Sequence, residues 1–124
     1  MPTVEPTRID ATEHVPVTAW DFAAATDAPV VIAIHDFTAN GLWFGDLAEA
    51  LNGRVRIIAP DLRGRAASVS APAPRRPDDH IADVIALADR IGAATFAIVG
   101  HGTGAQLALD VALFRMGCEY GVGL

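Results

Sequence analysis

The chain alternates between short apolar runs and stretches with helical spacing. Three near-continuous apolar runs, over residues 30–34, 55–59 and 95–99, are typical of strands buried on both faces. Apolar residues recur every three or four positions over residues 42–51, 78–91 and 105–115, which predicts three helices. Alternating strands and helices with short connections predict an α/β fold, a three-layer sandwich around a short, mostly parallel sheet.

Patterns at the edges of these elements add detail. Residues 8–22 alternate in part, with Val15, Val17 and Ala19 on one face, and predict an edge hairpin or one long strand. Trp43, Leu47 and Leu51 are expected to form the core stripe of the first helix, which Asn52 and Gly53 should end. Residues 61–77 are rich in Arg, Ala, Ser and Pro and predict a mobile surface loop.

The pattern changes after Arg115. The remaining residues, MGCEYGVGL, place glycines at a spacing of four and contain no buried-strand run. We therefore expect three parts: residues 1–28 with one or two edge strands and a loop, a core over 29–115, and an irregular tail over 116–124.

Charge limits the classes of partner. The chain has 124 residues, enough for one domain, and carries 15 acidic against 9 basic residues for a net charge of −6, with no lysine. Nucleic acid and anionic membranes require clustered Lys and Arg, so neither is expected as a partner.

Cysteine usage and the termini bear on location. Cys118 is the single cysteine and cannot form an internal disulfide. The first ten residues lack the basic and apolar regions of a signal peptide, and no apolar run approaches the roughly 20 residues that cross a bilayer. The expectation is a cytoplasmic protein.

The most informative stretch is TFAIVGHGTGAQLALDVALFR, residues 95–115. It predicts a strand, a tight glycine-rich turn with Gly102 at its tip, and a helix. Two further segments accompany it: VVIAIHDFTAN over residues 30–40 and RVRIIAPDLRGRAAS over residues 54–68. In order and spacing the three segments resemble the α/β-hydrolase superfamily, in its branch of esterases, lipases and epoxide hydrolases. That family has GxSxG where this chain has GHGTG.

The resemblance covers residues 29–115, the first half of the family's fold. It implies a truncated α/β-hydrolase sheet in which the 30–34 strand lies between the 55–59 and 95–99 strands. The outer edge of the 95–99 strand would then be unpaired and apolar, so we expect a homo-oligomer formed through that edge.

The resemblance also implies the site. Gly102 stands at the position of the nucleophile serine, and the backbone N–H groups of Phe37 and Thr103 correspond to the oxyanion hole. His35 and Asp36 replace the His-Gly of the oxyanion loop, where a carboxylate would repel an oxyanion. The family's acid and histidine follow later strands and have no counterpart here. The implied protein is esterase-like by descent, a pseudoenzyme without serine-hydrolase activity, and its status as an enzyme is left open.

Two alternatives use the same residues. A non-catalytic binding or interaction module on this fold would take a small apolar ligand or a complementary hydrolase half as its partner. GHGTGA also satisfies the dinucleotide fingerprint GxGxxA, for which Glu119 lies at the distance of the acidic ribose partner but is not preceded by a predicted strand. No cofactor is expected.

The remaining polar residues favour structural roles. His35 and His101 lie at strand ends and are expected to be hydrogen-bonded groups. Asp78, Asp79 and His80 are contiguous at a helix start, where capping explains the acids, and no metal site is expected. The arginines of the 61–77 segment are expected to be solvated, and Cys118 has no base beside it.

Overall fold

The computed structural model describes residues 5–74 and 76–120 of the chain. Its strands are β1 (Pro6–Asp10), β2 (Thr18–Phe22), β3 (Val30–Ile34), β4 (Arg56–Pro60) and β5 (Ala97–Gly100). Its helices are the 3-10 turns η1 (Gly41–Phe44) and η2 (Ala66–Ser68) and the α-helices α1 (Gly45–Leu51), α2 (Pro77–Arg90) and α3 (Thr103–Tyr120).

The strands form one five-stranded mixed sheet in the order β1-β2-β4-β3-β5. β3 pairs in parallel with both β4 and β5, as the sequence predicts, with Ile32 opposite Ile58 on one side and Ile98 on the other. β1 and β2 pair antiparallel, and β2 continues antiparallel onto β4. Of the two N-terminal interpretations, the edge hairpin is confirmed.

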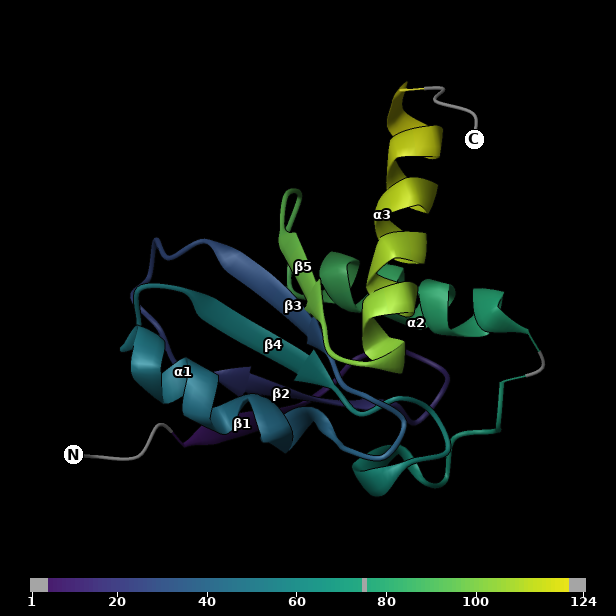
Figure 1. Ribbon diagram of the computed structural model, residues 1–124, viewed down its shortest axis with the longest axis horizontal. Coiled ribbons are helices and arrows are strands. Elements are labelled where there is room, and N and C mark those ends of the chain that lie inside the picture. The colour runs from purple at the N-terminus through teal and green to yellow at the C-terminus, as the bar shows by residue number, and fades with distance from the viewer. Residues whose placement is uncertain (1–4, 75, 121–124) are drawn as a thin grey trace.

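The helices cover the two faces of this sheet unequally (Figure 1). α2 and α3 pack on one face, where Ile32, Ile34 and Ile58 meet Leu87 and Val111 in the larger buried cluster. η1 and α1 cover the other face through a smaller cluster that contains Phe22, Phe44, Ala48 and Ile57. The predicted α/β sandwich of three layers is confirmed.

The first helix presents a different face from the one predicted. Its first turn is the 3-10 turn η1, and Phe44 and Ala48 are buried, whereas Trp43 and Leu47 are 52% and 42% exposed. The expected core stripe is therefore wrong for Trp43 and Leu47, whereas Leu51 packs against the smaller cluster as predicted. Gly41 explains the phase: its N–H donates to the Asp61 carboxylate, and a Cβ on it would lie 2.5 Å from the Ala59 carbonyl oxygen. This close approach fixes how the chain enters the helix.

The predicted irregular tail is also wrong where it can be judged. α3 continues past Arg115 and ends at Tyr120, and residues 121–124 lie outside the described part of the chain. A glycine inside a helix costs only about 1 kcal/mol relative to alanine, so Gly117 does not end a helix that is already propagating.

The segment after β4 is packed rather than mobile. Asp61, Leu62, Ser68 and Ala71 are each at most 4% exposed. Asp61 accepts hydrogen bonds from the Trp20 indole and from the backbone N–H groups of Gly41 and Ala67. A buried carboxylate needs such donors. The first half of the 61–77 segment therefore belongs to the core, and the prediction of a mobile surface loop is wrong for it.

None of the described helices is long and apolar enough to cross a bilayer.

Candidate functional site

The β5–α3 turn is built on two close backbone approaches. A Cβ on Gly100 would lie 2.2 Å from the Gly104 carbonyl oxygen, and one on Gly104 would lie 2.3 Å from the Ile34 carbonyl oxygen. The His101 N–H donates to that same Ile34 oxygen at 3.0 Å. Gly100 thus lets the turn fold tightly onto the start of α3, and Gly104 lets that start lie against the end of β3.

Gly102 lies at the tip of the turn with φ of +59°, in the left-handed region that glycine adopts without strain. A Cβ at this position would lie 2.6 Å from Asp36 Oδ1 and 2.8 Å from Asp36 Cγ. The space that a side chain at residue 102 would occupy therefore already holds the Asp36 carboxylate.

Asp36 is held there by three donors. Its Oδ1 accepts the Thr103 N–H at 3.1 Å and the Thr103 hydroxyl at 2.7 Å, and its Oδ2 accepts the Thr38 hydroxyl at 2.7 Å. The hydrogen bonds from Thr38 and then Thr103 hold the pKa of this carboxyl well below its usual range. Asp36 is therefore an anion at neutral pH.

The two N–H groups that the sequence predicts as oxyanion donors are both engaged within the chain. The Thr103 N–H donates to Asp36, and the Phe37 N–H donates to the Thr103 hydroxyl oxygen at 2.9 Å. The structure brings Phe37, Thr103, Asp36 and Gly102 together at one turn, where both N–H groups already have acceptors within the chain.

His35 is a fully buried structural group, as predicted. Its Nε2 accepts the Leu62 N–H at 3.0 Å, so the proton lies on Nδ1, which faces the Asp36 carbonyl oxygen at 2.6 Å. Burial lowers the pKa of this imidazole, which keeps it neutral. With both nitrogens used, His35 has no nitrogen left to act as a base.

His101 is exposed, and its ring stacks on the Trp43 indole with centroids 4.3 Å apart and an interplanar angle of 18°. This contact joins the β5–α3 turn to η1. The sequence predicts a hydrogen-bonded role for His101 and gives no signal for this stacking contact.

Arginines from the 61–77 segment have partners that the sequence analysis missed. Arg63 makes a two-pronged ion pair with Asp83 of α2 at 2.6 and 2.7 Å, with both side chains nearly buried. Arg65 donates to the Phe37 carbonyl oxygen at 2.9 Å, and its guanidinium lies 4.7 Å from the centre of the Phe37 ring. Spacing gave no signal for these pairs, because their partners lie on other elements.

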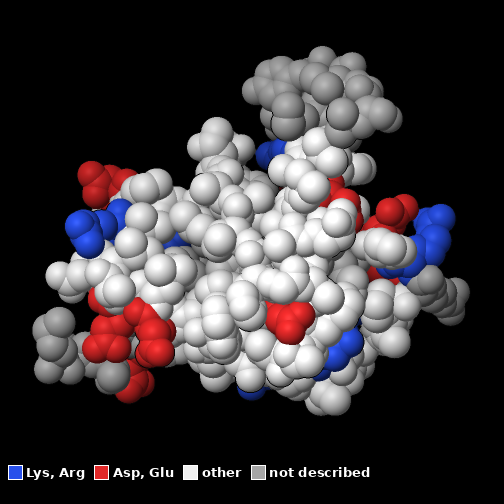
Figure 2. Space-filling view, viewed as in Figure 1, with Lys and Arg blue, Asp and Glu red and all other residues white. Residues whose placement is uncertain are grey.

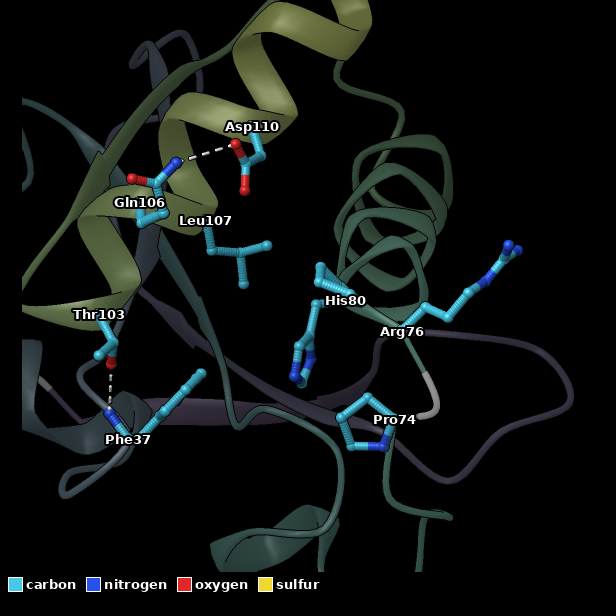
Figure 3. Close-up of a pocket in the computed structure, with 9 residues that line it drawn as sticks. Phe37, Pro74, Arg76, His80, Thr103, Gln106, Leu107 and Asp110 are labelled. Carbon is cyan, nitrogen blue, oxygen red and sulfur yellow. Dashed lines mark hydrogen bonds between the residues drawn. The ribbon is translucent and has the colours of Figure 1, made fainter.

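A cavity of about 420 Å³ lies beside Thr103 and Phe37, between the N-terminal halves of α2 and α3 (Figure 3). Most of its wall is apolar, from side chains that include Phe37, Pro74, Pro77 and Leu107. The polar side chains that line it are Arg76, His80, Thr103, Gln106 and Asp110. The sequence places His80 only at the start of a helix and gives no signal for this cavity.

Other kinds of site find no support in the described residues. No three His, Cys, Asp or Glu side chains among them gather as a metal site would require. Glu119 lies within α3 and does not end a strand, so the arrangement that the dinucleotide fingerprint needs is absent from the described chain.

The known proteins that this chain resembles include hydrolases, in agreement with its α/β fold. Residues 30–122 match the alpha/beta hydrolase family. The chain is 33% identical over 88 residues to the magnesium-chelatase 30 kDa subunit of Rhodobacter capsulatus, covering 70% of this chain and 31% of that protein. It is 33% identical over 98 residues to epoxide hydrolase 2 of Siraitia grosvenorii, covering 75% of this chain and 30% of that protein.

Among solved structures, epoxide hydrolase VrEH1 from Vigna radiata superposes with a TM-score of 0.71 at 25% identity, covering 91% of this chain and 36% of that one. The chain spans about a third of the length of the curated relatives it matches. One relative is named a chelatase subunit and the other an epoxide hydrolase, so similarity alone does not indicate which activity, if any, this chain has.

Proposed function

This chain belongs to the alpha/beta hydrolase family, and from that premise we propose that Gly102 stands at the family's nucleophile position and that the chain does not catalyse serine-type ester hydrolysis. It is esterase-like or lipase-like by descent and non-catalytic as it stands. The observation that carries this proposal is the Asp36 carboxylate, which lies where a nucleophile side chain would project.

The chemistry supports it. Ester hydrolysis by a serine needs an oxygen nucleophile, a base, and free N–H donors for the developing oxyanion. Gly102 supplies no oxygen, and the Thr103 N–H already binds a carboxylate. A second negative charge beside Asp36 would be repelled rather than stabilised.

The experiment is an ester-hydrolysis assay with p-nitrophenyl acetate on the parent chain and on Gly102→Ser. We expect no turnover above the buffer rate in either, and a lower urea midpoint for Gly102→Ser, because the serine Cβ meets Asp36 at a positive φ. Gain of turnover in Gly102→Ser would overturn the proposal.

We also propose that a complementary hydrolase half docks beside β5 and supplies the family's acid and histidine. In the described part of the chain β5 pairs on one side only, with β3, and Val99 on it is 39% exposed. Figure 2 shows a largely uncharged surface in the middle of this face, where β5 and the base of α3 lie. A strand added at this edge would satisfy its free backbone groups.

A second candidate function is a non-catalytic binding module. The cavity beside Thr103 favours it, because its apolar wall and its few polar groups suit a small apolar ligand. Saturable binding of such a ligand by the full chain would support this function, and a complete lack of binding would contradict it.

A further inference from the structure

His80, which lines the cavity, carries a buried nitrogen without a hydrogen-bond partner among the described residues. His80 is 7% exposed, and its Nδ1 is the one fully buried side-chain nitrogen or oxygen in the described part of the chain that finds no hydrogen-bond partner there. Leaving such a group unsatisfied is unfavourable, because on burial it has lost its hydrogen bonds to water. An occupant that satisfied it would recover part of that loss.

The surroundings of the His80 ring restrict which polar groups could hydrogen-bond to its Nδ1. His80 projects from α2 toward Phe37 and Pro74 in the close-up, with its ring centre 6.2 Å from that of Phe37 (Figure 3). His80 lines the cavity, and its Nδ1 has almost no solvent-accessible surface. The cavity is the open space beside this ring, so an occupant of the cavity is placed to hydrogen-bond Nδ1 once the ring turns toward it.

We propose that the cavity binds a small neutral molecule with an apolar body and a hydroxyl group, and that His80 Nδ1 hydrogen-bonds that hydroxyl. The inference rests on the second proposed function, the binding module. A hydroxyl both donates and accepts, so it suits Nδ1 in either tautomer of the imidazole. Phe37, Pro77 and Leu107 contact the apolar body.

Charge at the rim does not select a charged ligand. Asp110 lies at one side of the cavity and Arg76 at the other (Figure 3). The Asp110 carboxylate accepts the Gln106 side-chain amide at 3.1 Å, and the anionic Asp36 lies next to Thr103. Because Asp110 and Arg76 carry opposite charges on opposite sides of the cavity, the rim gives no net preference for a charged ligand.

The test compares two ligands of the same apolar shape, 2-phenylethanol and ethylbenzene, on the full chain by NMR titration. We expect both to bind, and only 2-phenylethanol to shift the ¹⁵N resonance of His80 Nδ1. His80→Phe should weaken binding of 2-phenylethanol about tenfold and leave binding of ethylbenzene unchanged. His80→Asn, whose amide lies close to the Nδ1 position, should retain most of the affinity for the alcohol.

The controls separate the inference from its premise. His14→Phe changes an exposed histidine that does not line the cavity and should alter neither affinity. If His80→Phe does not fold, His80→Leu carries the same expectation. Equal loss of both ligands in the His80 variants, or no shift of Nδ1 with the alcohol, would overturn the hydroxyl assignment alone. Absence of binding by either ligand would overturn the binding module as well.

Discussion

Asp36 and Gly102 share the space at the tip of the turn, because Asp36 Oδ1 lies 2.6 Å from the position that a Cβ on residue 102 would occupy. The Asp36 carboxylate uses the Thr103 N–H and hydroxyl, and the Cβ of any other residue at position 102 would overlap it. The sequence predicted the strained backbone of Gly102. It could not predict where the carboxylate lies, since Asp36 and Thr103 are 67 positions apart.

A double-mutant cycle measures this dependence. Gly102→Ala in the parent chain should lower the free energy of unfolding by more than the roughly 1–3 kcal/mol that a positive φ costs alanine, because it also clashes with Asp36. In an Asp36→Gly background the same substitution should cost only the backbone part. Equal losses in the two backgrounds, measured by urea titration, would show that the residues do not interact.

Ala66 is strained in a way that offers a gain in stability. Its φ is +46°, a conformation that glycine adopts freely and alanine does not. Ala66→Gly should raise the free energy of unfolding by about 0.5–1 kcal/mol, the relieved strain less the entropy that glycine loses on folding. Ala67→Gly is the matched control in the same 3-10 turn and should be destabilising. A loss of stability in Ala66→Gly would contradict the strain.

The two buried histidines predict a pH dependence. Burial lowers the pKa of His35 and His80 from the ordinary 6.5, against the opposing effects of Asp61 and Asp36 on His35 and of Asp83 and Asp79 on His80. Arg65 lowers both, and Arg63 lowers that of His80. The unfolded chain therefore takes up protons first as pH falls below 6.5, so the free energy of unfolding should decline from that point downward. Urea titrations at several pH values check this decline. A smaller decline in His80→Phe would show that His80 contributes part of it.

At the scale of elements, the apolar pattern predicted the strands and helices but not the phase of α1 or the order of the 61–77 segment. Both depend on Asp61, whose donors come from β2, η1 and η2. A proline-rich and arginine-rich composition gives no signal for such contacts, because they join residues up to 41 positions apart.

Removing the Asp61 carboxylate tests its role as the link between these elements. Asp61→Ala would leave three buried or half-buried N–H donors without an acceptor, so the free energy of unfolding should fall by about 3 kcal/mol or more. Asp27→Ala removes an exposed acid and should change it by less than about 0.5 kcal/mol. Similar urea midpoints for the two variants would contradict the assignment of Asp61 to the core.

At the scale of the whole molecule, the sheet ends at β5 with an edge that is paired on one side in the described chain. The sequence predicted this order because the family resemblance fixes it. It did not predict the length of α3, since glycine spacing suggested an irregular tail. We propose that this edge pairs with a second copy of this chain or with a complementary hydrolase half.

We expect the chain to self-associate through this edge when no other partner is present. Val99→Lys places a charge on the exposed side of β5 and should shift the mass measured by light scattering toward that of the monomer. Val69→Lys changes a 71% exposed residue away from this edge and should leave the mass unchanged. A parent chain that is monomeric at all concentrations would contradict self-association.

The central claim is that the turn of this hydrolase-family chain holds no working nucleophile, and the most direct measurement is covalent labelling with a fluorophosphonate, read by intact mass spectrometry. We predict that the folded chain, incubated with the reagent at neutral pH, keeps its unmodified mass, because Gly102 has no hydroxyl and the Thr103 hydroxyl is bonded to Asp36. A stoichiometric adduct, mapped to Thr103 or to any other residue of this turn, would contradict the account.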